Sequence, residues 1–195
     1  MSQSAYAFSD HPQVRRTRDR LNNWPIAIAG ILWLLPMSGF WTRFIPALRP
    51  FDFDAPFPPL GIFLGGIALC CAPLLLPESY YRPKGFERGR LYPSLGLRLF
   101  RRWAPDGDFI NRRLRAIDPD YRAVRSRAAL KEHIRSTHSN ERAHLVLLLA
   151  GLLTAVFALA LNELTRAALL IPGNIAFNLY PVMHQRYKRA RLRRS

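Results

Sequence analysis

Uncharged apolar stretches interrupt the chain at four places, and each is close to the length of a membrane-spanning helix. Such a helix needs about 20 mainly apolar residues, within a range of roughly 17–25. The pattern therefore predicts four transmembrane helices, at about 24–41, 56–77, 144–161 and 167–184. The fourth stretch is marginal because two prolines interrupt it.

The polar residues between these stretches complete the expected architecture. We expect an all-α membrane protein in which residues 1–195 form a single integral membrane domain. A cytoplasmic segment at 78–143 separates the second and third spans, and a basic tail at 185–195 follows the fourth.

The composition alone fits either a nucleic-acid-binding protein or a membrane protein, since 49% of the 195 residues are hydrophobic and the net charge is +16. The basic residues lie beside the apolar stretches, where each gains about 1 kcal/mol from anionic lipid headgroups. No nucleic-acid-binding signature is present. We therefore expect membrane lipids as partners and no nucleic acid. The only cysteines, Cys70 and Cys71, are adjacent in an apolar stretch, so neither a disulfide nor a metal site is expected.

Lys and Arg residues are distributed unevenly around the predicted spans. The segment 78–143 holds sixteen of them and the last ten residues hold six, whereas the two short connections hold three in all. Basic residues are in excess in cytoplasmic segments. This distribution predicts a multi-pass protein of the cytoplasmic (inner) membrane with both termini in the cytoplasm.

The segment 78–143 contains a predicted amphipathic helix that ends at Trp103. Leu95, Leu99 and Trp103 recur every four residues, with arginines on the other flank, and "APDG" then predicts a turn. A helix of this kind lies flat in the membrane interface. It is expected to anchor the segment, and it also suits one wall of a site where an amphiphile meets a soluble co-substrate.

A carboxylate and an imidazole lie one helical turn apart at the start of the third span, as Glu141 and His144. A carboxylate at this spacing can orient an imidazole and raise its basicity, as a general base requires. The alternative is that both residues serve as cap and interface residues of the helix.

The fourth span carries amide side chains that need partners within a membrane. Asn174 and Asn178 are four residues apart and therefore share one face, and Gln185 and Arg186 follow about two turns later. If the third and fourth spans form an antiparallel hairpin, Asn178, Gln185 and Arg186 converge on the end where Glu141 and His144 lie. The alternative is hydrogen bonding between helices together with anchoring by basic residues. On either interpretation, the basic end from Lys188 to Arg194 is expected only to orient the chain.

Three segments resemble one known family. They are "THSNERAH" (137–144), "NLYPVMHQRYKRAR" (178–191) and "FERGRLYPSLGLRLFRRWAPDG" (86–107). In this order they are similar to elements of the glycosyl-4,4'-diaponeurosporenoate acyltransferases of staphyloxanthin-type carotenoid pathways. The resemblance covers roughly the C-terminal two-thirds of the chain.

The resemblance implies transfer of a fatty acyl chain to a sugar hydroxyl of a glycosylated carotenoid. Such a transfer needs a base for the hydroxyl proton and donors for the developing oxyanion. We expect His144 to be the base and Glu141 to orient it. The expected substrate-binding residues are Asn174, Asn178, Gln185, Arg186, Arg101, Arg102 and Trp103, of which Arg101 and Arg102 suit a phosphate of the acyl carrier. No cofactor is expected besides an acyl-coenzyme A or acyl-carrier-protein co-substrate.

Two other functions stay open on the sequence alone. One is an acyltransferase that acts on another glycolipid. The other is a non-catalytic membrane protein that binds isoprenoid lipids, in which the polar span residues are only helix contacts. The oligomeric state is not indicated by any pattern.

Overall fold

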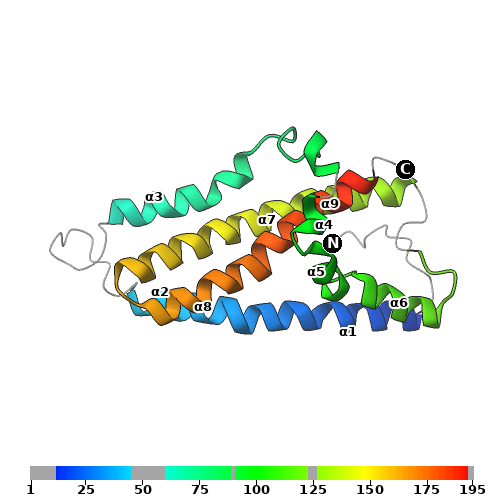
Figure 1. The fold of residues 1–195 in the computed structure, drawn as a ribbon, viewed down its shortest axis with the longest axis horizontal. Coiled ribbons are helices and arrows are strands. Elements are labelled where there is room, and N and C mark those ends of the chain that lie inside the picture. The colour runs from blue at the N-terminus through cyan, green and yellow to red at the C-terminus, as the bar shows by residue number, and fades with distance from the viewer. Residues whose placement is uncertain (1–11, 45–59, 89–90, 123–126, 193–195) are drawn as a thin grey trace. The chain divides into compact units, whose positions relative to one another are not determined.

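The computed structural model describes residues 12–44, 60–88, 91–122 and 127–192, and in these ranges it is helical with no β-strand (Figure 1). The all-α expectation is therefore confirmed. The elements are, in order, α1 (Pro12–Ala29), η1 (Gly30–Leu34), α2 (Leu35–Phe44), α3 (Leu60–Cys71), η3 (Ala72–Leu75), η4 (Gly85–Arg88), α4 (Leu91–Ser94), α5 (Leu97–Trp103), α6 (Asp108–Ile117), α7 (Arg127–Ala160), α8 (Leu164–Asn174), η5 (Ile175–Leu179) and α9 (Tyr180–Leu192).

Two of the elements, η1 and η5, are single π-helical segments inside longer helical runs. Each lies between two prolines, Pro25 and Pro36 around η1, and Pro172 and Pro181 around η5. A proline donates no backbone hydrogen bond, and its ring clashes with the carbonyl four residues earlier. A wider π turn is one way for a helix to continue through such a site.

The chain divides into two compact units. The first contains Met1–Ile28, Tyr81–Glu141 and Met183–Ser195, and the second contains Ala29–Tyr80 and Arg142–Val182. The division falls inside α1, α7 and α9, so three helices contribute residues to both units.

The first unit has a small apolar core in which Val14 of α1 packs with Ile110 and Leu114 of α6. The α5–α6 turn is tied to α1 by Asp106, which accepts hydrogen bonds from Arg18 Nε at 2.9 Å and Asn22 Nδ2 at 2.9 Å. A side chain at Gly107 would lie 2.2 Å from a carbonyl oxygen of α5, so only glycine fits there. The turn predicted at "APDG" is confirmed.

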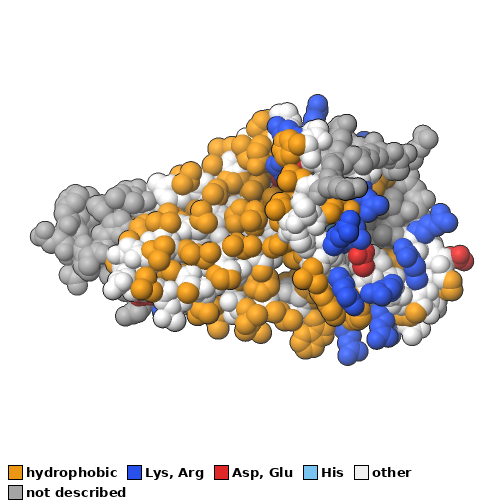
Figure 2. All heavy atoms as spheres, in the orientation of Figure 1, with side chains coloured by type: hydrophobic (Ala, Val, Ile, Leu, Met, Phe, Trp, Pro, Cys, Tyr) orange, Lys and Arg blue, Asp and Glu red, His pale blue; other side chains and the backbone are white. Residues whose placement is uncertain are grey.

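The predicted amphipathic helix corresponds to α5, which begins at Leu97 because Gly96 adopts a left-handed conformation (φ 80°). The predicted apolar face is exposed, with Leu99 at 68% and Trp103 at 59% of their accessible surface. Leu97 lies on the other side and is buried. Figure 2 shows Lys and Arg side chains gathered on the surface around α5 and α6.

In the second unit, α7 and α8 form an antiparallel hairpin and lie side by side in Figure 1. Phe40 of α2 packs with Ala158 of α7 and Ala167 of α8, and Trp41 Nε1 donates a hydrogen bond to Thr154 Oγ1 at 2.9 Å. Large apolar side chains are nevertheless exposed on every long helix of this unit, and they form the broad hydrophobic surface seen in Figure 2.

Two helical stretches, Pro12–Thr42 and Leu130–Ala160, are long and apolar enough to cross a membrane. They contain the first predicted span and all but the last residue of the third. Of the second predicted span, residues 56–59 lie outside the described residues, and the rest includes the shorter apolar helix Phe63–Leu75. The fourth predicted span corresponds to the run from α8 through η5 to the start of α9, so the four-span arrangement stays a prediction.

Candidate functional site

The first unit contains a buried network of ion pairs that joins α7, α9 and the η4–α4 segment. Glu141 is fully buried, and its two carboxylate oxygens accept hydrogen bonds from Arg186 Nε at 2.7 Å and from Arg189. Arg186 also donates through NH1 to Glu87 at 2.9 Å, and the Tyr92 hydroxyl donates to the same Glu87 oxygen at 2.7 Å. Arg186 therefore bridges two carboxylates from distant parts of the sequence.

The network keeps the Glu87 carboxylate charged. Burial by itself raises the pKa of Glu87, but hydrogen bonds from Tyr92, the backbone and Arg186 more than offset it and hold that pKa below its ordinary value. Burial and the hydrogen bond to Glu87 raise the pKa of Tyr92 well above its ordinary range. Tyr92 is therefore a neutral donor and Glu87 a carboxylate, which is the arrangement that stabilises a buried arginine.

A polar cavity of about 630 Å³ lies in the same unit and is lined by side chains from α1, α6, α7 and α9. His184, which is 3% exposed, and Gln185 both line it, and the His184 Nε2 and Gln185 Oε1 atoms are buried with no hydrogen-bond partner in the described part of the chain. Burial lowers the pKa of Lys188 in the same wall, and the charge of Asp106 only partly offsets this. Unpaired buried polar atoms are costly, so the cavity suits a ligand that carries hydroxyl groups.

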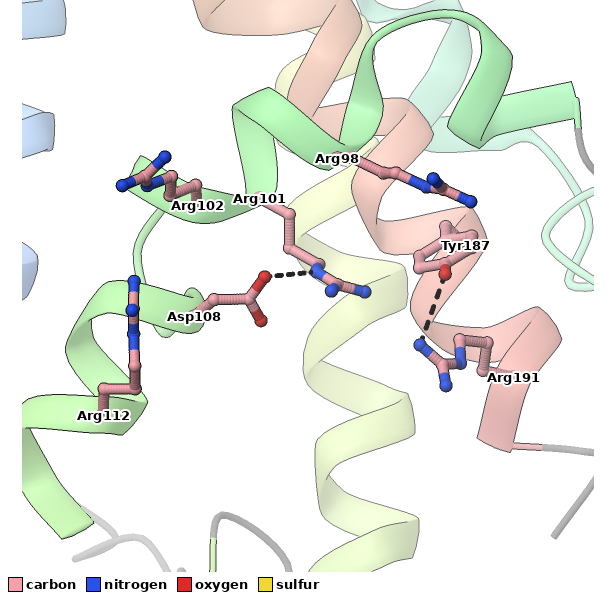
Figure 3. A pocket seen from close by; sticks show the side chains of 7 residues that line it. All are labelled: Arg98, Arg101, Arg102, Asp108, Arg112, Tyr187 and Arg191. Carbon is pink, nitrogen blue, oxygen red and sulfur yellow. Dashed lines mark hydrogen bonds and ion pairs between the residues drawn. The ribbon is translucent and has the colours of Figure 1, made fainter.

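A second cavity of about 680 Å³ is strongly cationic (Figure 3). It lies between α5, α6 and α9, and shares several lining residues with the polar cavity, among them Arg101 and Tyr187. The residues that line it are Arg98, Arg101, Arg102, Asp108, Arg112, Tyr187 and Arg191. This composition favours an anionic ligand.

The second unit contains a chain of uncharged polar side chains between α7 and the run from α8 to η5. Asn174 Nδ2 donates to the Leu148 carbonyl at 2.9 Å, and Asn178 Nδ2 donates to Asn174 Oδ1 at 2.8 Å. The chain ends at His144, whose Nδ1 lies 3.4 Å from Asn178 Oδ1. An imidazole held by an amide through one ring nitrogen can exchange a proton at the other.

The described residues contain no group of three or more His, Cys, Asp or Glu side chains arranged to hold a metal ion.

Comparison with known families identifies the chain. Residues 77–195 match the family model described as glycosyl-4,4'-diaponeurosporenoate acyltransferase, and this is more than half of the chain. The chain belongs to this family. It is therefore an acyltransferase of a carotenoid pathway. Neither the curated proteins nor the solved structures that were compared gave a match.

All the site residues predicted from the sequence lie in the matched part of the acyltransferase. The structure brings Glu141 into contact with Arg186, and His144 with Asn178. Gln185 lines the polar cavity. Both oxygens of Glu141 are bonded to arginines, so its role in orienting His144 stays a prediction.

Of the three predicted site residues in α5, two line the cationic cavity and the third does not. Arg101 and Arg102 line this cavity. Trp103 does not, and its ring instead lies 5.7 Å from that of Phe109, with the Arg102 guanidinium 5.6 Å from it. The expected binding roles of all three stay predictions.

Several residues of the acyltransferase that the structure places in these sites were not predicted. Glu87 and Tyr92 lie in a stretch that resembles the family, but nothing in their spacing indicates an ion pair with residue 186. The prediction that the basic end from Lys188 serves only for orientation is wrong for Arg189, which is 2% exposed and pairs with Glu141. The signal for it was present, because Arg189 follows Arg186 by three residues and so shares its helical face.

Proposed function

We propose that the protein is a membrane-embedded enzyme that esterifies a sugar hydroxyl of a glycosylated carotenoid with a fatty acyl chain. The observation that carries this proposal is the chain from Leu148 through Asn174 and Asn178 to His144, within the region that matches the family. It supplies an imidazole at the end of a run of amide side chains that hydrogen-bond to one another. That is where an apolar acceptor bearing a sugar would react.

In the proposed reaction, the sugar hydroxyl oxygen attacks the carbonyl carbon of an acyl thioester. His144 takes the hydroxyl proton, a new C–O bond forms, and the C–S bond breaks. The proton then passes to the thiolate that leaves. Asn178 acts through His144 by holding its imidazole.

Glu141 is assigned as a positioning residue. Its carboxylate holds Arg186 and Arg189 of α9, and it precedes His144 by one helical turn of α7. The network fixes the side chain of Arg186, which otherwise has many rotamers.

The proposed setting is the cytoplasmic membrane, with four spans and both termini in the cytoplasm. Exposed apolar side chains on the second unit support it, since a protein surrounded by water rarely exposes so many together. Two helices of sufficient length and the basic segments between apolar stretches agree with this topology.

The test is pigment analysis in a host that makes the glycosylated carotenoid but not its ester. Cells with the wild-type protein should form the acylated product, measured by mass spectrometry of the lipid extract. His144→Gln keeps a hydrogen-bonding side chain but lacks a base, and it should accumulate the free glycoside. His138→Gln on the same helix is the control and should form the ester.

Two results would contradict the proposal. Ester formation by His144→Gln at the wild-type level would exclude His144 as the base. Acylation of a different glycolipid, with the carotenoid glycoside unchanged, would exclude the proposed acceptor and leave the acyltransferase assignment intact.

A further inference from the structure

The cationic cavity of the first unit gathers arginines from two consecutive helices, α5 and α6, and from α9 near the end of the chain. Arg98 and Arg102 come from α5, Arg112 from α6 and Arg191 from α9, and Arg101 extends into the space between them (Figure 3). Arginines repel one another, so five around one cavity are stable only with counter-ions or a ligand.

Two of these arginines are held in place by other side chains of the cavity. Arg101 donates through Nε to Asp108 at 2.9 Å, which leaves its two terminal nitrogens for a ligand. Arg191 donates to the Tyr187 hydroxyl at 3.3 Å, and both guanidiniums lie within 6 Å of the Tyr187 ring centre, at 5.9 and 5.7 Å. Donors held in advance lose less rotamer entropy when a ligand binds.

The cavity is not neutralised from within. Among the described residues that line it, Asp108 is the one carboxylate, and it is already bonded to Arg101. Within the described ranges no carboxylate pairs with Arg98, Arg102 or Arg112. A ligand with several negative charges is needed to balance the positive charge of the other arginines. Phosphate groups suit this role, because a guanidinium can donate two parallel hydrogen bonds to two phosphate oxygens.

The neighbouring surface of α5 is apolar. Leu99 and Trp103 are exposed next to Arg98 and Arg102 in sequence and point away from the buried Leu97. A ligand with a phosphorylated head and an apolar chain would therefore meet both kinds of surface on one helix.

We propose that the cationic cavity binds the phosphate groups of the acyl donor, a soluble thioester of the coenzyme A type that carries several phosphates. This inference rests on the proposed function and adds to it the donor class and its site. A carrier protein or a membrane phospholipid presents a single phosphate diester, which would leave most of the arginine charge unbalanced. A coenzyme A thioester brings several phosphates on one small molecule.

The test uses the full-length protein in nanodiscs of neutral phosphatidylcholine, titrated with coenzyme A by calorimetry. Arg98→Ala and Arg112→Ala remove exposed side chains and should each weaken binding roughly tenfold, as expected for the loss of a charge-assisted hydrogen bond. The double variant should weaken binding further. Arg115→Ala is the matched control, because this exposed arginine lies on α6 one turn beyond Arg112 and outside the cavity.

A second set of titrations distinguishes binding of coenzyme A from binding of lipid headgroups and of free phosphate. Coenzyme A should still bind when anionic phosphatidylglycerol is added to the discs, and inorganic phosphate should compete only weakly. The proposal is overturned if wild-type protein fails to bind coenzyme A in neutral discs. It is also overturned if phosphatidylglycerol displaces coenzyme A, or if Arg112→Ala binds it as tightly as Arg115→Ala does.

Acyl transfer measured with the same variants distinguishes this inference from the proposed function. If both hold, Arg112→Ala should raise the KM for acyl-coenzyme A and leave kcat nearly unchanged at saturation. If coenzyme A binds in a way that depends on the arginines but no ester forms, the proposed function is contradicted and the proposed binding site still stands. If the double variant forms the ester with an unchanged KM for acyl-coenzyme A, the proposed binding site is contradicted and the proposed function still stands.

Discussion

The two units of the protein bury polar side chains of different kinds. In the first unit the buried set includes Glu87, Glu141 and Arg189, which are charged and paired. In the second unit the polar side chains recorded as buried in the described ranges are Thr154, Asn174 and Asn178, and all are uncharged. A charged pair of this unit, Glu163 with Arg166, lies near the turn between α7 and α8.

The difference follows from the partners that each unit offers to a buried charge. Removing a charge from water costs several kcal/mol unless a partner and further hydrogen bonds compensate it. The first unit provides such partners through the arginines of α9. The second exposes apolar side chains, and the polar residues classed as buried in its described ranges are two asparagines and a threonine. Anionic ligands should therefore be recognised in the first unit, and apolar ligands in the second.

The largest expected effect comes from breaking the charge network. Glu141→Ala leaves Arg186 and Arg189 buried without one of their counter-charges, and the loss of stability should be about 3–5 kcal/mol. A thermal melt of the purified protein in detergent measures it. Glu132→Ala on the same helix is the control, because that side chain is 43% exposed and its contact with Arg135 is 4.0 Å long, worth at most about 1 kcal/mol. Equal melting temperatures for the two variants would contradict the prediction.

A smaller effect is expected at the edge of the network, and it should depend on pH. Tyr92→Phe removes the hydrogen bond to Glu87, which should cost about 1.5–3 kcal/mol at neutral pH. The pKa of Glu87 lies below its ordinary value in the folded protein, so its contribution to stability is present above the unfolded pKa and is lost as the pH falls through the folded one.

Melting curves from neutral to acidic pH test this dependence. The difference between wild type and Tyr92→Phe should be largest at neutral pH and should shrink in acid, because Glu87 becomes protonated in both proteins. Tyr187→Phe serves as a comparison, since its hydroxyl receives a hydrogen bond from the exposed Arg191 and from no carboxylate in the described residues. A pH-independent difference for Tyr92→Phe would show that Glu87 does not hold its charge.

Packing should matter more in the second unit, where close contacts replace ion pairs. A β-carbon at Gly151 would lie 2.7 Å from both the Asn174 side chain and Trp33 Cζ2, so Gly151→Ala should cost about 1–3 kcal/mol. Gly65→Ala in α3 meets nothing within 4 Å and should be neutral or slightly stabilising. Similar melting temperatures for the two variants in detergent would contradict this packing.

The helices could be predicted from the sequence to the extent that apolar runs and turn residues define them. The turn before Gly107 and the helical character of all four apolar stretches were correct for the residues described. The helix α6 was not predicted, although Ile110, Leu114 and Ile117 have helical spacing. The arginines between them weaken the hydrophobic periodicity. The π segments were not predictable, since a proline can be accommodated in several ways.

The candidate site could be predicted only where its residues are close in sequence or on the same helix face. The four-residue spacing of Asn174 and Asn178 correctly indicated that their side chains meet. The pair between Arg186 and Glu87 spans 99 positions, and no local pattern can indicate such a contact. The same reason explains why Arg98, Arg112 and Arg191 were not predicted to line a cavity with Arg101 and Arg102.

The smallest expected effect comes from the amide chain of the second unit. Asn174→Ala removes a hydrogen bond to the Leu148 carbonyl and one from Asn178, and hydrogen bonds between membrane helices are worth about 0.6 kcal/mol each on average. Neither direct partner of Asn174 carries a titratable group, so the loss should be the same at neutral and acidic pH, in contrast to that of Tyr92→Phe. Thr165→Ala, which changes an exposed residue of the same helix, should have no measurable effect. A loss for Asn174→Ala as large as that for Glu141→Ala would mean that the second unit depends on its polar groups as strongly as the first.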